Sequence, residues 1–187
     1  MQNLQMTNPT PITLEQLLTA REQRQERQNQ LLQQYHCTLI SLTINMPGKY
    51  KLTHDSYLLF NEAVNAIETL IRKEKWSILH QYLHAPITGC EGFWVIADHE
   101  AIEIKRSLIE LEQQHQLGRL WDIDVFDPHT GIAISRKMLS IEPRRCLICE
   151  STAKACARSQ QHTLQQLLTV IHDKIANYRH IHAIADK

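Results

Sequence analysis

Neither sign of charge is in excess in this 187-residue chain, since 20 Lys and Arg residues balance 20 Asp and Glu residues. A surface that attracts nucleic acid or a membrane over long range usually carries a net charge, so the composition favours neither partner. The chain also lacks a run of about 18 apolar residues, the length of a membrane-spanning helix. Residues 1–10 have neither the basic start nor the apolar centre of a signal peptide. We therefore expect a cytoplasmic protein.

Cysteine is scarce and odd in number, with five residues in all. Without a secretory signal, thiols are expected in a reducing compartment, where they stay free or bind metal rather than form disulfides. The length corresponds to one domain, and a hydrophobic content of 43% is enough for a core. We predict a single domain over residues 1–187, in which residues 145–187 form a Cys-rich, helical C-terminal segment.

The N-terminal part of the chain predicts a helix with an unusual middle. Thr13 followed by Gln16 is a capping-box pattern, and leucines come directly after it. Residues 21–30 are then almost wholly polar and rich in arginine and glutamine. Two interpretations are open. Either the helix is solvated and docked only at its two ends, or its basic face meets phosphate or an acidic partner.

The remaining pattern mixes helices with short strands linked by turns. Alternation of apolar and polar residues indicates strands, and apolar residues at a 3.6-residue spacing indicate helices. In chain order they predict a strand at 37–44, a helix from Asp55 or Ser56 to about residue 71, strands at 76–82 and 93–97, a helix capped by Asp98, and a final helix at 163–178 with a frayed, His-rich tail. This order predicts an α+β fold around a mostly antiparallel sheet.

The most informative segment is Gly-Arg-Leu-Trp-Asp-Ile-Asp-Val at residues 118–125. If it is a strand, Asp122 and Asp124 project from one face, and the apolar residues between them project from the other. Two adjacent carboxylates are costly unless a cation satisfies them, and a divalent metal takes carboxylate oxygens and also bridges to phosphate. The alternative is a pair of surface acids on an edge strand.

A turn pattern at residues 127–131 and a return strand at 132–135 follow the two aspartates. Consecutive antiparallel strands are neighbours, so the chain that leaves the return strand should come back beside the acids. It carries Arg144 and Arg145, and arginine binds phosphate oxygens in a bidentate fork. The two arginines are therefore candidate phosphate ligands, and the alternative for them is an ordinary solvated loop.

Three cysteines and a histidine make a second constellation, Cys146-x2-Cys149-x6-Cys156-x5-His162. Three thiolates and an imidazole are a chemically sound zinc set, and four protein ligands would make the zinc structural. Inert buried thiols and a redox pair are the alternatives. Cys37 and Cys90 are expected to have no role.

Several segments resemble the citrate lyase holo-acyl-carrier-protein synthase family, also called the apo-citrate lyase phosphoribosyl-dephospho-CoA transferase family. The similarity lies in residues 12–18, 21–25, 117–125, 143–150, 156–158 and 162. It implies a nucleotidyltransferase that moves the phosphoribosyl-dephospho-CoA group from triphosphoribosyl-dephospho-CoA to a serine of the acyl-carrier subunit of citrate lyase, with release of pyrophosphate. The Asp-x-Asp strand is also similar to that of polymerase-β-like nucleotidyltransferases, although Arg119 stands where that pattern has a serine after the glycine.

The resemblance and the residue types together predict the roles in the site. Asp122 and Asp124 would hold Mg²⁺ or another divalent cation, and one of them or His115 would accept the serine proton. Phosphate would be bound by Gly118, Arg119, Arg144 and Arg145. For His115 the alternative is a helix C-terminal residue placed on the helix dipole. The competing class of function is a non-catalytic, zinc-stabilised interaction module, which has no need of the acid pair.

Overall fold

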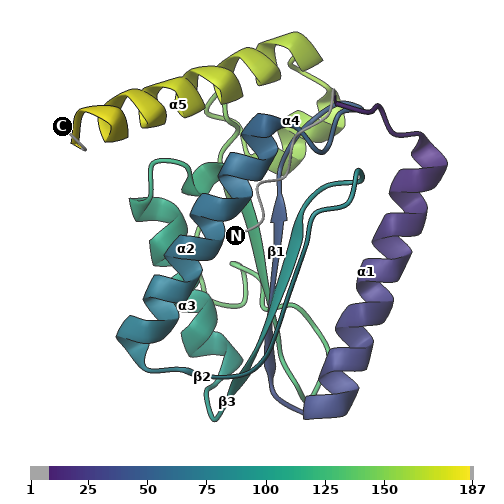
Figure 1. The fold of residues 1–187 in the computed structure, drawn as a ribbon, viewed down its shortest axis with the longest axis vertical. Helices are drawn as coiled ribbons and strands as arrows, with labels where there is room; N and C mark the ends of the chain where they lie inside the picture. Colours follow the sequence, from purple (N-terminus) through teal and green to yellow (C-terminus); the bar gives the residue numbers. More distant parts are fainter. Residues whose placement is uncertain (1–8, 186–187) are drawn as a thin grey trace.

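The computed structural model describes residues 9–185, which form a four-stranded sheet with helices on both faces (Figure 1). The strands stand in the order β2-β3-β1-β4, and every pair is antiparallel. This confirms the predicted α+β class. The elements are α1 (Leu14–Tyr35), β1 (Thr38–Ile44), α2 (His54–Glu74), β2 (Ser77–His84), β3 (Glu91–Ala97), α3 (Ala101–Gln114), the 3-10 turn η1 (Gly118–Leu120), β4 (Trp121–Phe126), α4 (Ala153–Ser159) and α5 (Leu164–Ala185).

Helices α2 and α3 cover one face of the sheet, α1 (purple) lies against the other, and α5 (yellow) lies across one end (Figure 1). The main core lies between the sheet and α2 and α3, where the apolar stripes of both helices are buried. A smaller core joins the C-terminal end of α1, through Leu31 and Leu32, to Leu39, Phe93 and Val95 of the sheet.

Two of the predicted helix N-caps are wrong, because the structure has other residues at these positions. The capping box of Thr13 and Gln16 is confirmed. Helix α2, however, is capped by Thr53, whose hydroxyl accepts a hydrogen bond from the Ser56 N–H (3.1 Å), so Ser56 is the reciprocal partner rather than the cap. Asp98 does not cap α3. Its φ of 56° places it in the preceding left-handed turn, and Glu100 begins the helix without a side-chain hydrogen bond.

The C-terminal third differs most from the prediction. The turn at residues 127–131 is present, but the return strand at 132–135 is reduced to a single bridge between Phe126 and Ala133, because the chain turns again over residues 136–140. Helix α4 was not predicted, and α5 continues to Ala185, beyond the end expected at residue 178. Of residues 1–10, whose polar character argued against a signal peptide, 1–8 lie outside the described residues.

The face of the sheet under α1 changes from apolar to polar along the strands. The row Val95–Leu39–Phe126 is apolar and lies in the smaller core or packs on it. In the next row Ser41 stands between Phe93 and Asp124, and in the row after it Thr43 stands between Glu91 and Asp122. The polar middle of α1 therefore faces polar rows of the sheet instead of core. In the part of the chain that the structure describes, no helix is long and apolar enough to cross a membrane.

Candidate active site at the edge strand

The acid pair lies on β4 as the alternation predicted. Trp121, Ile123 and Val125 are buried in the main core, while Asp122 and Asp124 project from the opposite face, toward α1. The neighbouring strand adds two hydroxyl groups on the same face, because Ser41 and Thr43 are the register partners of the aspartates. The result is a group of hard oxygen atoms from two adjacent strands.

Asp124 is in an unfavourable setting for a carboxylate. Burial, and then the charge of Asp122, raise its pKa above the usual range, and Lys105, Arg144 and Arg24 only partly oppose this shift. Within residues 9–185 its carboxylate takes part in no hydrogen bond or ion pair. A cation bound between the two aspartates would relieve this cost, since an opposite charge favours the ionised form.

Arg144 lies directly beside the pair. Its guanidinium donates to the main-chain oxygen of Trp121 (3.0 Å) and to Asp122 Oδ1 (3.2 Å), and it also donates to Glu112. The chain after the turn does return to the acid pair, as expected, although it returns as an irregular segment rather than a strand. The Arg144 guanidinium therefore places a positive charge directly beside the two aspartates.

Glu112 organises the cations around the acid pair, and the sequence reasoning missed it. Its side chain is 4% exposed and accepts hydrogen bonds from Arg144 and from Arg136 (2.7 Å). Burial raises its pKa, and the neighbouring cations oppose that shift. Lys105 was missed as well. It donates to the main-chain oxygen of Ile123, and burial lowers its pKa.

A signal for these two residues exists in the sequence. Lys105 and Glu112 both belong to the buried stripe of α3, at the helical spacing of Ala101, Ile104 and Leu108. A charged residue on an apolar stripe is rarely buried without a partner. An ion-pair network under this helix could therefore have been predicted.

Two cavities meet at the acid pair. The larger, about 700 Å³, lies beside β4 and the segment that returns from it, and five cationic side chains line it: Lys105, Arg136, Lys137, Arg144 and Lys154. The smaller, about 280 Å³, lies between the sheet and α1 and includes Arg21 and Arg24. Asp122 and Asp124 line both, so they form part of the wall between the two spaces.

The polar middle of α1 is fixed to the sheet rather than simply solvated. Arg24 pairs with Glu91 (3.0 Å), Arg27 pairs with the same carboxylate, and Gln28 donates to Ser41 Oγ (3.1 Å). The C-terminal end of α1 is buried in the smaller core through Leu31 and Leu32, whereas at its start Leu14 is 71% exposed and Leu17 is half-buried. Its inward side chains thus make one side of the smaller cavity.

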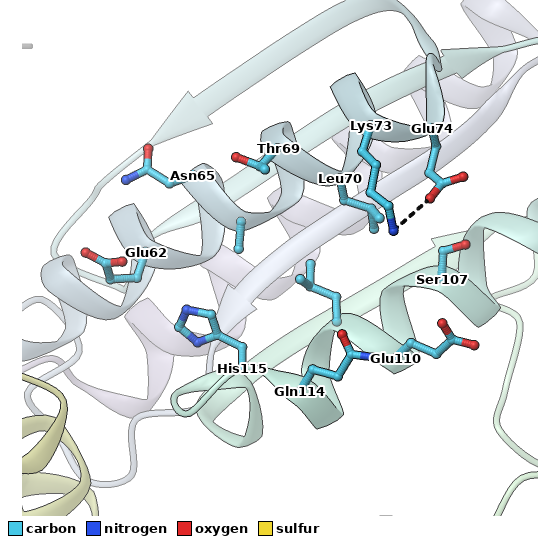
Figure 2. A pocket seen from close by; sticks show the side chains of 12 residues that line it. Glu62, Asn65, Thr69, Leu70, Lys73, Glu74, Ser107, Glu110, Gln114 and His115 are labelled. Carbon is cyan, nitrogen blue, oxygen red and sulfur yellow. Dashed lines mark ion pairs between the residues drawn. The ribbon is translucent and has the colours of Figure 1, made fainter. Parts of the chain in front are cut away.

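His115 does not lie with the acid pair. Its ring packs at a tilt against Trp121 (4.4 Å between centroids), whose side chain points to the opposite face of β4 from the aspartates. It lines a separate cavity of about 460 Å³ between α2 and α3, together with Glu62 (Figure 2). Burial lowers its pKa, and its Nδ1 accepts the Leu117 N–H (3.1 Å). This placement fits a structural residue and does not support the predicted role as the base.

Three further predicted residues have other contacts. Gly118 is buried, and a Cβ there would lie 2.3 Å from the Glu112 carbonyl oxygen, so the glycine permits close packing against α3 rather than access to phosphate. Arg145 is exposed and pairs with Glu150, and neither residue lines the larger cavity. Arg119 donates to the main-chain oxygen of Arg145, which ties η1 to the start of the Cys-rich segment.

The second constellation comes together in the structure. One ligand atom from each of Cys146, Cys149, Cys156 and His162 lies within 4.8 Å of all the others. The Ile148 N–H donates to Cys146 Sγ (3.4 Å), and His162 Nε2 is buried without a hydrogen-bond partner among the described residues. A buried, unpaired imidazole nitrogen beside three thiols is the donor set of a Cys3His metal site.

The thiols of this cluster influence one another's ionisation. Burial opposes ionisation of Cys146, but N–H groups of Ile148 and Cys149 and the adjacent thiols lower its pKa to about 6. Burial and the thiols of Cys146 and Cys149 raise the pKa of Cys156 to about 12. One thiolate is therefore already favoured at neutral pH, the form in which cysteine binds metal.

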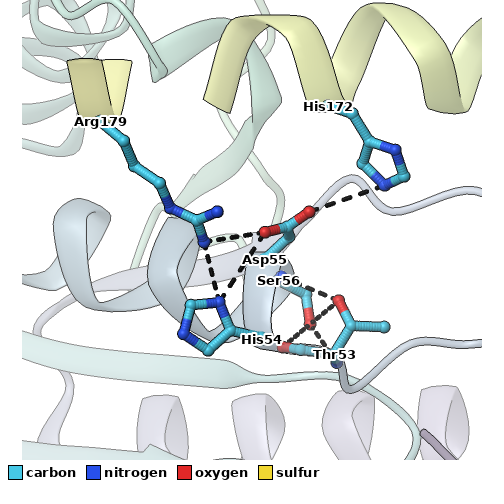
Figure 3. Close-up of polar contacts among 6 residues, drawn as sticks. All are labelled: Thr53, His54, Asp55, Ser56, His172 and Arg179. Atoms are coloured by element: carbon cyan, nitrogen blue, oxygen red, sulfur yellow. Dashed lines mark hydrogen bonds and ion pairs between the residues drawn. The ribbon is translucent and has the colours of Figure 1, made fainter. Parts of the chain in front are cut away.

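Helix α5, which follows His162, is fixed to the N-terminal end of α2 by polar contacts (Figure 3). Arg179 donates to Asp55 (2.9 Å) and contacts His54 Nδ1 (2.8 Å), while His172 lies 3.6 Å from the other oxygen of Asp55. Further along, the Tyr178 hydroxyl donates to Glu62 (2.6 Å). The Cys-rich segment is thus followed by a helix attached to the body of the domain.

Comparison with known proteins gives a consistent set of relatives. A family model for apo-citrate lyase phosphoribosyl-dephospho-CoA transferase matches residues 12–178. A protein of that name from Citrobacter koseri is 40% identical over 166 residues, which cover 87% of this chain and 90% of the relative. Another, from Escherichia coli O1:K1 / APEC, is 41% identical over 157 residues, which cover 84% and 85%. The matched range includes the acid pair, Arg144 and the Cys–His cluster.

Proposed function

Because the chain belongs to the apo-citrate lyase phosphoribosyl-dephospho-CoA transferase family, we propose that it attaches the phosphoribosyl-dephospho-CoA prosthetic group to apo-citrate lyase. The donor is triphosphoribosyl-dephospho-CoA, and the acceptor is a serine hydroxyl of the acyl-carrier subunit. The serine oxygen forms a bond to the α-phosphorus, and the bond from that phosphorus to pyrophosphate breaks. The observation that supports this most strongly is the acid pair with Arg144, placed where two cavities meet.

A divalent cation such as Mg²⁺ fits the acid pair. Asp122 and Asp124 offer carboxylate oxygens on one face, and a bound cation would offset the burial and the Asp122 charge that raise the pKa of Asp124. Such a cation supplies neutralisation of the charge that grows on the phosphate oxygens. Binding of a metal by two acids on one strand would be similar to the site of nucleotidyltransferases. The position of both acids on β4, beside a cavity lined by cations, supports this proposal.

The larger cavity is the proposed place for the triphosphate end of the donor. Its five cationic side chains are balanced only in part by Asp122, Asp124 and Glu142, which also line it. Arg144 and Arg136 are held on Glu112 and so present fixed donors, which orient a phosphate without further loss of side-chain entropy. Arg145 and Arg119 are not among the residues that line this cavity and have other contacts, so the proposal gives neither a direct phosphate contact.

The smaller cavity is the proposed approach for the acceptor serine. It reaches the acid pair from the side of α1, so the hydroxyl and the leaving pyrophosphate would lie on different sides of the α-phosphorus, as in-line displacement requires. A carboxylate of the pair is then the nearest acceptor for the serine proton. His115, on the other face of β4, is not in reach of it.

Pyrophosphate release on mixing the chain with the acyl-carrier subunit and triphosphoribosyl-dephospho-CoA tests the proposal. Asp122→Asn and Asp124→Asn should each lower the rate roughly a hundredfold, the scale of losing transition-state charge stabilisation. The matched control is Asp173→Asn, an exposed acid on α5, which should keep the wild-type rate. Near-normal rates in both site variants would remove the acid pair from the mechanism.

We also propose that the Cys–His cluster binds one zinc ion with a structural role. All four ligands come from the chain, which leaves no open position for catalysis. Metal analysis should find about one zinc per chain, and a chelator should lower the melting temperature. If zinc and carrier binding are found without any pyrophosphate release, the alternative of a zinc-stabilised interaction module takes the place of the transferase.

A further inference from the structure

The Cys-rich loop begins at Arg144 itself. The main-chain oxygen of Arg144 accepts a hydrogen bond from the Ala153 N–H (2.8 Å), and the Cys146 N–H donates to the Ser151 oxygen (2.8 Å). A bridge between Arg145 and Thr152 completes this closure. The backbone position of Arg144 is therefore set by the same short loop that carries Cys146 and Cys149.

Few contacts order this loop besides its own closure: Leu147 packs partly buried on the main core, and Arg119 donates to the Arg145 oxygen. In the described chain no helix or strand lies between Phe126 and Ala153, and of residues 145–159 only the Cys156 side chain is buried. Fixing each residue's backbone costs about 1–2 kcal/mol in conformational entropy, and so few buried apolar groups repay little of it. A segment of this kind is expected to open locally unless another interaction fastens it.

The four ligands of the cluster come from different segments, so a bound metal would hold the Cys-rich loop in place. Cys146 and Cys149 come from the loop, Cys156 from α4, and His162 from the chain just before α5. Helix α5 is attached to α2 through Arg179 and Tyr178. A metal in the cluster would therefore join the segment of Arg144 to the body of the domain.

We propose that zinc bound by Cys146, Cys149, Cys156 and His162 is the positioning element that holds the Arg144 guanidinium against Asp122 and Glu112. The rate of transfer would then depend on bound zinc because zinc positions Arg144. The ion itself would not contact the substrate. The activity readout of this inference rests on the proposed function, whereas the structural readout below does not.

Loss of zinc should disturb Arg144 strongly, because its contacts use both terminal nitrogens of the guanidinium in a fixed geometry. One nitrogen donates to both the Trp121 oxygen and Asp122, and the other donates to Glu112. A displacement of about 1 Å is enough to break geometry of this kind and to cost a large factor in rate. Lys137 lies outside the Cys-rich loop and has no side-chain hydrogen bond or ion pair within residues 9–185, so loosening the loop should affect it less.

A double-mutant cycle in the transfer assay tests the inference. Cys149→Ser should lose zinc and lower the rate by about tenfold to a hundredfold, and Arg144→Ala should lower it by a similar factor. If the cysteine acts through the arginine, the double variant should be no slower than the slower single variant. Cys149→Ser combined with Lys137→Ala should instead give the product of the two effects. Cys37→Ser, at a cysteine outside the cluster, should keep both zinc and rate.

Limited trypsin digestion of the wild-type chain gives a readout that does not depend on activity. Trypsin cuts after arginine, so the bonds after Arg144 and Arg145 should be protected with zinc bound, exposed after chelation, and protected again when zinc is added back. Multiplicative effects of Cys149→Ser and Arg144→Ala would overturn the inference, as would unchanged cleavage after zinc removal or a wild-type chain without zinc. If pyrophosphate is never released but zinc still protects these bonds, the proposed function fails and the fastening of the loop stands.

Discussion

The packing of Gly118 against α3 yields a sharp prediction for Gly118→Ala. The added Cβ would lie 2.3 Å from the Glu112 oxygen and 2.8 Å from its carbonyl carbon and Cα, all backbone atoms that no side-chain rotation can move. An ordinary contact begins at 3.4 Å, so η1 and α3 must separate by about 1.1 Å. Overpacking typically costs 1–3 kcal/mol, and we expect about 3 kcal/mol here because backbone must shift. For a chain of this length that corresponds to a fall in Tm of roughly 6–12 °C.

The same displacement should reach the active site. Glu112 holds Arg144 and Arg136, so moving its backbone by about 1 Å should also lower the rate of pyrophosphate release by about tenfold or more. The control is Gly131→Ala, where nothing lies within 4 Å of the new Cβ but φ is +67°. It should cost about 1 kcal/mol through backbone strain alone and leave the rate unchanged. A Gly118→Ala variant with wild-type Tm in thermal unfolding would refute the close approach.

Two further predictions concern charge. Glu112→Gln should release Arg144 and Arg136 and lower the transfer rate at least tenfold. The control, Glu110→Gln, changes an exposed residue of the same helix and should have no effect. Equal rates for the two variants would show that Glu112 does not organise the cations. Because the pKa of Asp124 is raised on folding by burial and by Asp122, its ionisation costs stability once the pH rises through the folded pKa, and below the unfolded pKa this cost vanishes. In the absence of divalent cations Asp124→Asn should therefore raise Tm at neutral pH but not near pH 3, where free aspartate with a pKa of about 3.9 is protonated; a lower Tm at neutral pH would contradict the strained acid pair.

Several features follow from local periodicity and were correctly predicted. The alternation around Asp122 and Asp124 placed both acids on the face of β4 opposite the core, because successive strand residues point to opposite sides. The capping box at Thr13 and the inward stripe of α2 were also correct. The errors at Asp98 and at the return strand lie where the chain turns, because a turn is decided by φ values and by later segments rather than by a repeating pattern.

The sequence by itself determined the four strands of the sheet, every α-helix but α4, the family resemblance and the residue types that chemistry needs, because these depend on spacing along the chain. Only the tertiary structure decided which of these residues meet. It brought Arg144 to the acid pair and left Arg145 exposed, although the two are adjacent in sequence. It also packed His115 against Trp121, away from the acid pair, and paired Glu112 of α3 with Arg136 and Arg144. These outcomes depend on how an irregular segment packs across the end of a sheet, and long-range packing of that kind leaves no periodic trace in the sequence.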